Sequence, residues 1–159
     1  MPIATAAQIE RFEQAPAQVL ASLEGLEEAQ IQHIPAEGEW SIQQIVVHLG
    51  DSEALGYWRL RKTLAEEGST LPVYAEATWA QKLSYQTQER GLALTLFSSL
   101  RASTAALLRS LPAAAWEITS NHPEHGTIKV YDLFNIYLEH GEIHLQQIER
   151  IKQSFSTIA

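Results

Sequence analysis

Apolar residues recur at three- and four-residue intervals along most of the chain, which is the period of an amphipathic α-helix. Four long segments show this pattern, at residues 5–29, 41–66, 87–111 and 130–153. The second segment opens with Ser41 and Gln44, which match the S-x-x-Q capping box of a helix start, and Pro112 ends the third. Four amphipathic helices joined by connections predict an all-α fold, a four-helix bundle.

The connecting segments carry weaker patterns. Residues 67–86 are too many for a structureless loop in a compact domain, so we expect a short helix around Glu76–Leu83. Residues 113–129 are predicted to be a plain connection, and no segment predicts a strand. The 159 residues are therefore expected to form one domain that spans 1–159.

Composition and charge narrow the function classes. The chain has 11 Lys and Arg against 19 Asp and Glu, a net charge of −8, and an acidic surface repels nucleic acids and anionic membranes. Because there is no cysteine, disulfides, zinc ribbons and a catalytic thiol of the chain's own are excluded. The N-terminal residues lack the pattern of a signal peptide and no segment is apolar enough to predict a membrane span. We therefore expect a cytoplasmic protein with no nucleic-acid or membrane partner.

Two histidines in the fourth segment are the sharpest chemical signal. His140 and His144 are four residues apart, so both rings lie on one helix face. That face is the apolar one, since it also carries Leu133, Ile136, Tyr137, Ile148 and Ile151. A divalent metal would satisfy both imidazoles in an apolar interior, and bonding to backbone carbonyls or carboxylates is the alternative. Gly141 follows His140, which excludes the H-E-x-x-H metalloprotease pattern.

The second segment offers a third ligand. His48 lies at the edge of that helix's apolar stripe, where a bundle builds sites from facing side chains, and a boundary histidine with one ring nitrogen in water is the alternative. Glu53 falls near the middle of the same stripe, and a carboxylate there must be paired. It would orient a ligating histidine from the second shell, or form a buried pair with an arginine. His122 and His125, in NHPEHG, are expected to lie in a solvated loop.

The order of these motifs resembles the DinB-like superfamily, which includes the YfiT-type metal-dependent hydrolases. The resemblance rests on EWSIQQIVVHLGDSE and on HPEHGTIKVYDLFNIYLEHGEIHLQQI, and it covers nearly the whole chain. It implies an up-down-down-up bundle, usually dimeric, whose metal is held by His48, His140 and His144. It also implies nickel or zinc as the metal and a low-molecular-weight thiol as cosubstrate. One departure is Lys129, where relatives often carry a Ser or Thr helix cap, so capping is expected from Thr127 or water.

Three histidine ligands leave metal positions open, which is typical of catalytic sites. Such a site activates water for hydrolysis, or a thiol for transfer, on a small-molecule substrate. We expect Arg59 to hold a carboxylate of the substrate or cosubstrate and Tyr137 to donate a proton, with a surface arginine and a packed tyrosine as the alternatives. The alternative function is a non-catalytic, stress-related or small-molecule-binding bundle with a structural metal or none. We also expect a homodimer, chiefly because of the family resemblance.

Overall fold

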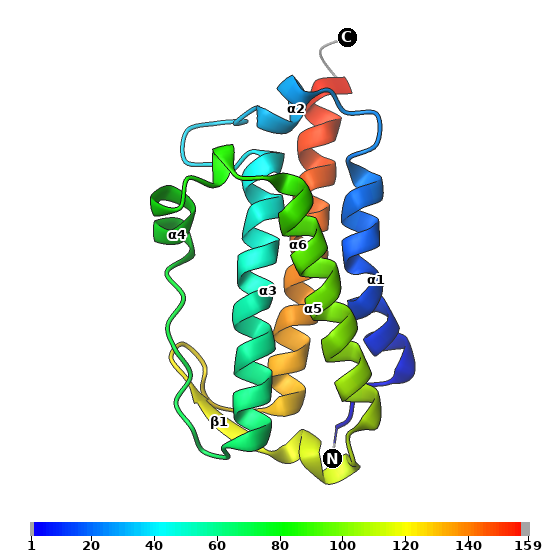
Figure 1. The fold of residues 1–159 in the computed structure, drawn as a ribbon, viewed down its shortest axis with the longest axis vertical. Coiled ribbons are helices and arrows are strands. Elements are labelled where there is room, and N and C mark those ends of the chain that lie inside the picture. The colour runs from blue at the N-terminus through cyan, green and yellow to red at the C-terminus, as the bar shows by residue number, and fades with distance from the viewer. Residues whose placement is uncertain (1, 157–159) are drawn as a thin grey trace.

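The computed structural model describes residues 2–156, and four long helices build most of it (Figure 1). They are α1 (Ala6–Ser22), α3 (Ile42–Ala65), α5 (Arg90–Ser110) and α6 (Val130–Ser156). The shorter elements are α2 (Glu28–Gln32), α4 (Glu76–Lys82), η1 (Tyr85–Thr87), η2 (Ala113–Glu117), β1 (Thr119–His122) and β2 (Gly126–Lys129). The four predicted long helices and the predicted short one are present, and the four-helix bundle is confirmed. The first helix is shorter than predicted: α1 ends at Ser22, the chain turns at Gly25 with a φ of 78°, and α2 forms a separate helix.

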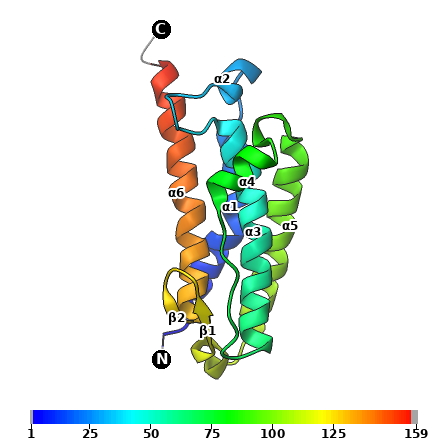
Figure 2. The same ribbon diagram turned by 90° about the vertical axis from the view of Figure 1, so that its left-hand side faces the viewer.

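The bundle runs up, down, down and up. α1 and α6 climb from the end that holds the N-terminus, whereas α3 and α5 both descend (Figure 1). Because α3 and α5 point the same way, the chain between them has to return along the length of the bundle. Figure 2 shows this crossover, residues 66–89, rising beside α3 and carrying α4 near its upper end. The crossover thus covers one side of the bundle.

Helix caps and apolar packing follow the sequence pattern closely. Ser41 accepts from the backbone N–H of Gln44, and the Gln44 side chain accepts in return from the backbone N–H of Ser41, so the predicted capping box is present. The core has two large apolar parts, one at each end of the bundle, and a small third one of Val47, Ala80 and Tyr85 between α3 and the crossover. The lower part includes Phe12, Leu60, Leu108, Trp116 and Phe134, and the upper part includes Val19, Ile42, Ile45, Phe97 and Ile148.

A fully buried ion pair lies between the two large apolar parts. The Arg101 Nε on α5 donates to Glu53 Oε2 on α3 at 2.8 Å. Its two other nitrogens donate to the backbone carbonyls of Phe12 at 2.9 Å and Tyr137 at 2.6 Å. A Cβ at Gly141 would lie 2.9 Å from both of these nitrogens, so only glycine leaves room for the guanidinium there. One side chain therefore joins all four long helices.

The segment before α6 differs from the prediction, because it forms an antiparallel hairpin rather than a plain connection. β1 pairs with β2 in a register that sets His122 opposite Gly126, and Gly126 takes a φ of 68° at the turn. The start of α6 also differs. Asp132 Oδ2, rather than Thr127, accepts from the backbone N–H of Lys129 at 3.0 Å.

One described helix, α5, is long and apolar enough to span a membrane by length and composition, which the sequence analysis did not expect. Its packing shows a different role. Phe97, Arg101 and Leu108 are buried against the neighbouring helices, and a buried ion pair ties it to α3. α5 is therefore a helix of this bundle, with leucines on its outer face.

We expect Arg101→Met to lower the free energy of unfolding by about 3–5 kcal/mol, because Glu53 would remain as an unpaired buried charge. Urea unfolding followed by circular dichroism measures this. The matched control is Arg109→Met, since Arg109 forms an exposed pair with Glu13 and its loss should cost under about 1 kcal/mol. Equal losses in the two variants would contradict the central role of the buried pair.

Candidate metal centre

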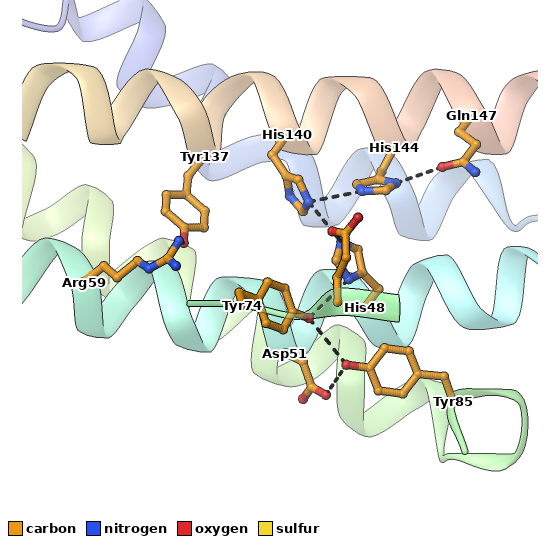
Figure 3. A network of polar contacts seen from close by, with 10 residues as sticks. His48, Asp51, Arg59, Tyr74, Tyr85, Tyr137, His140, His144 and Gln147 are labelled. Carbon is orange, nitrogen blue, oxygen red and sulfur yellow. Dashed lines mark hydrogen bonds and ion pairs between the residues drawn. The ribbon is translucent and has the colours of Figure 1, made fainter. Parts of the chain in front are cut away.

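Three imidazoles from two helices meet in the upper half of the bundle (Figure 3). His48 comes from α3, and His140 and His144 come from α6, one helical turn apart. The Nε2 atom of His140 lies 3.0 Å from Nε2 of His48 and 3.1 Å from Nε2 of His144. The structure therefore brings together the three histidines that the sequence singles out, each with the same ring nitrogen turned inward.

Hydrogen bonds on the outer side fix His144. Its Nδ1 lies 2.9 Å from the Gln147 side-chain oxygen, which can only accept. Nδ1 of His144 therefore carries the proton, and Nε2 presents a lone pair to the centre of the cluster.

A chain of hydroxyl groups likewise places the ring proton of His48 on Nδ1 and leaves a lone pair on its Nε2 (Figure 3). His48 Nδ1 lies 3.3 Å from the Tyr74 hydroxyl, which lies 3.5 Å from the Tyr85 hydroxyl, and Tyr85 donates to Asp51 Oδ2 at 2.6 Å. Since the carboxylate accepts at the far end, the protons along this chain point toward Asp51 and His48 donates from Nδ1. Burial raises the pKa of Tyr74 to about 12, so its hydroxyl keeps its proton.

The three ring nitrogens cannot satisfy one another. Lone pairs of His48 and His144 both point toward His140 Nε2, which holds at most one proton and can donate to only one of them. A cation at the centre would accept all three lone pairs. The donor set therefore fits a divalent metal ion of the kind that binds imidazole.

Burial keeps the histidines neutral. Desolvation, with a smaller contribution from His144, lowers the pKa of His48 to about 3. Desolvation also lowers the pKa of His140 to about 2, with help from His144, His48 and Arg101. The pKa of His144 is lowered by burial as well. Neutral imidazole is the form that binds a metal, so the cluster is ready for one at neutral pH without losing protons.

Aromatic rings hold the cluster while one side stays accessible. Trp40 packs 4.8 Å from the His48 ring, centroid to centroid, and stacks on His144. His48 is fully buried, but His140 and His144 are half-buried. Glu76, on α4, brings an exposed carboxylate to 3.8 Å from His48 Nε2. The crossover thus adds an acidic group at the inward-facing nitrogen of the cluster.

Arg59 and Tyr137 form a second polar contact next to the cluster (Figure 3). Arg59 Nη1 donates to the Tyr137 hydroxyl at 3.2 Å, and the Tyr137 ring lies 6.4 Å from the His140 ring. Arg59 is buried, so the alternative of a surface arginine is wrong. A Cβ at Gly56 would lie 2.5 Å from the Tyr137 ring, so this glycine makes the space that the ring occupies.

Glu53 follows one of its two predicted alternatives, and His122 differs from its prediction. Glu53 bonds to Arg101 and not to a histidine, so it forms the buried pair with an arginine and does not orient a metal ligand. The orienting role belongs instead to Gln147 and to the hydroxyl chain that ends at Asp51. His122 is buried on β1 rather than solvated in a loop.

The structure adds residues that sequence reasoning missed. Asp51 and Gln147 each follow a cluster histidine by three residues, a spacing that puts them on the same side of the helix and could have indicated them. Tyr74, Glu76 and Tyr85 lie in the crossover, where no periodic pattern marked them.

Comparison with known proteins agrees with the fold. The model of the DinB superfamily matches residues 11–148. This chain belongs to the DinB superfamily. A relative from Halalkalibacterium halodurans, named "Putative metal-dependent hydrolase", is 27% identical over 135 residues, which cover 85% of this chain and 78% of the relative. A relative of the same description from Oceanobacillus iheyensis is 34% identical over 111 residues, covering 70% of this chain and 64% of the relative.

Two solved structures share the fold. YfiT from Bacillus subtilis, described as a probable metal-dependent hydrolase with an unusual four-helix bundle topology, superposes with a TM-score of 0.89. It is 24% identical, and the match covers 98% of this chain and 93% of YfiT. A mycothiol-dependent maleylpyruvate isomerase superposes with a TM-score of 0.69 at 13% identity, over 89% of this chain and 59% of that one. The DinB-like four-helix bundle is therefore established for this chain.

We expect the metal-free protein to lose stability as the pH falls from about 6.5 toward 5. The unfolded chain gains protons on His48 and His140 in this range, whereas the folded pKa values of about 3 and about 2 keep both rings neutral. Each histidine should contribute a slope of up to about 1.4 kcal/mol per pH unit. Urea unfolding in the presence of a chelator measures the slope. His48→Gln should reduce this slope, whereas His33→Gln, at an exposed position, should leave it unchanged. An unchanged slope in His48→Gln would contradict the lowered pKa of His48 in the folded protein.

Proposed function

We propose that this protein is a metal-dependent enzyme in which His48, His140 and His144 hold one divalent ion, nickel or zinc, and act on a small-molecule substrate. The observation that carries the proposal is that three Nε2 atoms converge on one point. The hydrogen bonds at Nδ1 of His48 and His144 leave the Nε2 atoms of these two rings without a proton. Three protein ligands, of which His140 and His144 are half-buried, correspond to a catalytic site rather than to a closed structural one.

When bound, the ion would supply a Lewis acid that activates either water or a low-molecular-weight thiol. The thiol would have to come from outside, because the chain has no cysteine. The names of the curated relatives support hydrolysis, and the name of the mycothiol-dependent isomerase supports a thiol reaction. Both reactions use the same arrangement of protein side chains.

The chain's own residues then have separate tasks. Gln147 and the Tyr74 hydroxyl hold the rings of His144 and His48 in place. The Glu76 carboxylate, near His48 Nε2, accepts the proton that the water or thiol gives up. Tyr137 holds a proton at its hydroxyl because burial raises its pKa more than the neighbouring Arg59 lowers it. Since Arg59 donates to the hydroxyl oxygen, the Tyr137 O–H is free to donate to another group. That proton is available to the leaving group of the substrate.

We also propose a homodimer that forms through the outer face of α5. Leu92 and Leu96 are exposed there, at 69% and 41% of their surface, and Leu20 of α1 is exposed as well. Apolar side chains that gather on one face of a helix are typical of a contact surface. The cytoplasmic location expected from the sequence stays a prediction.

His144→Ala should abolish stoichiometric binding of nickel and zinc and any hydrolase or thiol-transferase activity, while leaving the helical circular dichroism spectrum unchanged. The bundle is held by its apolar cores and by the Arg101 pair, and not by the cluster. Elemental analysis of the metal-loaded protein measures the effect, with His33→Ala as the control. Wild-type protein that stays metal-free when supplied with both metals would contradict the proposal.

Light scattering should return about twice the chain mass of 17.8 kDa for the wild type. The double change Leu92→Glu and Leu96→Glu should halve that value, because it places charges in the proposed contact. Ile143→Glu, at another exposed apolar position on α6, is the matched control and should remain dimeric. A wild-type mass near that of one chain would overturn the dimer.

A further inference from the structure

The two buried arginines differ in how their charges are compensated. Arg101 is paired with the carboxylate of Glu53. Arg59 is only 5% exposed, yet its bonds go to the Tyr137 hydroxyl and the Pro72 carbonyl, both of which are neutral. Its Nε has no partner, and within residues 2–156 no carboxylate lies at ion-pair distance from it. A buried cation without an ion pair is unfavourable. The Glu124 carboxylate is near enough to influence the pKa of His122 and of Tyr137, but it forms no ion pair with Arg59, so Arg59 remains a candidate partner for an anion.

His122 carries a second unpaired group, and its tautomer can be assigned. Its Nδ1 accepts from the backbone N–H of Glu124 at 3.2 Å, so the ring proton of the neutral form is on Nε2. That Nε2 is buried and has no partner. The unpaired atom of His122 is therefore a donor, as is the unpaired Nε of Arg59.

The fold places these two donors opposite each other. Thr63 Oγ1 on α3 bonds to Ser120 Oγ on β1 at 3.0 Å. The crossover rises beside α3, which descends, so the two run in opposite directions (Figure 2). β1 pairs in parallel with the crossover through Asn121 and Thr70, so β1 also runs opposite to α3. Arg59 lies one helical turn before Thr63, about 6 Å, and His122 lies two strand residues beyond Ser120, about 6.6 Å. The positive charge of Arg59 accordingly contributes to the lowered pKa of His122.

Two unpaired donors and one uncompensated positive charge call for an acceptor with negative charge. A carboxylate meets this requirement, because it is an anion with two oxygens that can each accept from an N–H group. A cation does not. His122, Glu124 and His125 do have ligand atoms within 4.8 Å of one another, but the free nitrogen of His122 bears its proton and stands beside a guanidinium.

We propose that Arg59 and His122 bind a carboxylate group of the substrate. The inference rests on the proposed function, since Arg59 also holds Tyr137 and the Tyr137 ring packs 6.4 Å from His140. The substrate class is then a small carboxylic acid that reacts at the histidine cluster while its carboxylate lies between α3 and β1. Arg59 and His122 select the substrate in this scheme, and the cluster performs the chemistry.

Acetate is the probe, and the metal-free protein in a chelator is the sample, so that the result does not depend on the metal. Side-chain ¹H–¹⁵N NMR at constant ionic strength follows Nε2 of His122 and Nε of Arg59. Acetate should shift both signals in a saturable way, acetamide should not, and inorganic phosphate should bind more weakly. Arg59→Met and His122→Phe should each weaken acetate binding about tenfold. The matched controls Arg109→Met and His33→Leu, at exposed positions, should leave it unchanged.

Three results would overturn this proposal. Acetate could leave both signals unchanged, as expected if the donors hold only a water molecule. It could bind Arg59→Met and wild type equally. Zinc could shift His122 and His125 in His144→Ala, which would indicate a cation site instead. Failure of the proposed metal site would look different: acetate would still bind between Arg59 and His122, but elemental analysis of the protein supplied with nickel or zinc would find no metal.

Discussion

The buried pair of Arg101 and Glu53 is the interaction on which the rest of this structure depends. A guanidinium in the middle of an apolar bundle requires a counter-ion and an acceptor for each nitrogen, and it finds them on three other helices. Its bond to the Tyr137 carbonyl anchors α6 at a point one turn before His140. Its bond to Glu53 anchors α3 at a point between His48 and Arg59. The relative height of α3 and α6, and hence the meeting of the histidines, follows from these bonds.

The second constraint is the parallel direction of α3 and α5. The chain between two parallel helices has to travel the length of the bundle (Figure 2), and this crossover supplies several of the groups that contact the cluster. Tyr74 and Tyr85 orient His48, Glu76 reaches its inner nitrogen, and Pro72 covers Arg59. The bundle thus carries the histidines, while the crossover carries the groups that would control protons and access.

The sequence predicts the helices and the histidine cluster because both depend on helical periodicity. A stripe of apolar residues shows that His140 and His144 face inward, and a cap at Ser41 sets the start of α3. Periodicity cannot show which group faces a buried carboxylate, so the sequence could not decide whether the partner of Glu53 is a histidine or an arginine. Periodicity also does not predict a hairpin whose formation depends on its turn. The β1–β2 hairpin depends on the positive φ of Gly126 and not on an alternating pattern, so the burial of His122 could not be predicted.

In the proposed site, three imidazoles share one metal ion and leave room for other ligands. X-ray absorption spectroscopy of the nickel- or zinc-loaded protein tests this arrangement most directly, because it counts the imidazoles around the metal. Three imidazole nitrogens at about 2.0–2.1 Å are expected, together with oxygen ligands from solvent. A spectrum with one imidazole or none, from protein that retains a folded bundle, would contradict it.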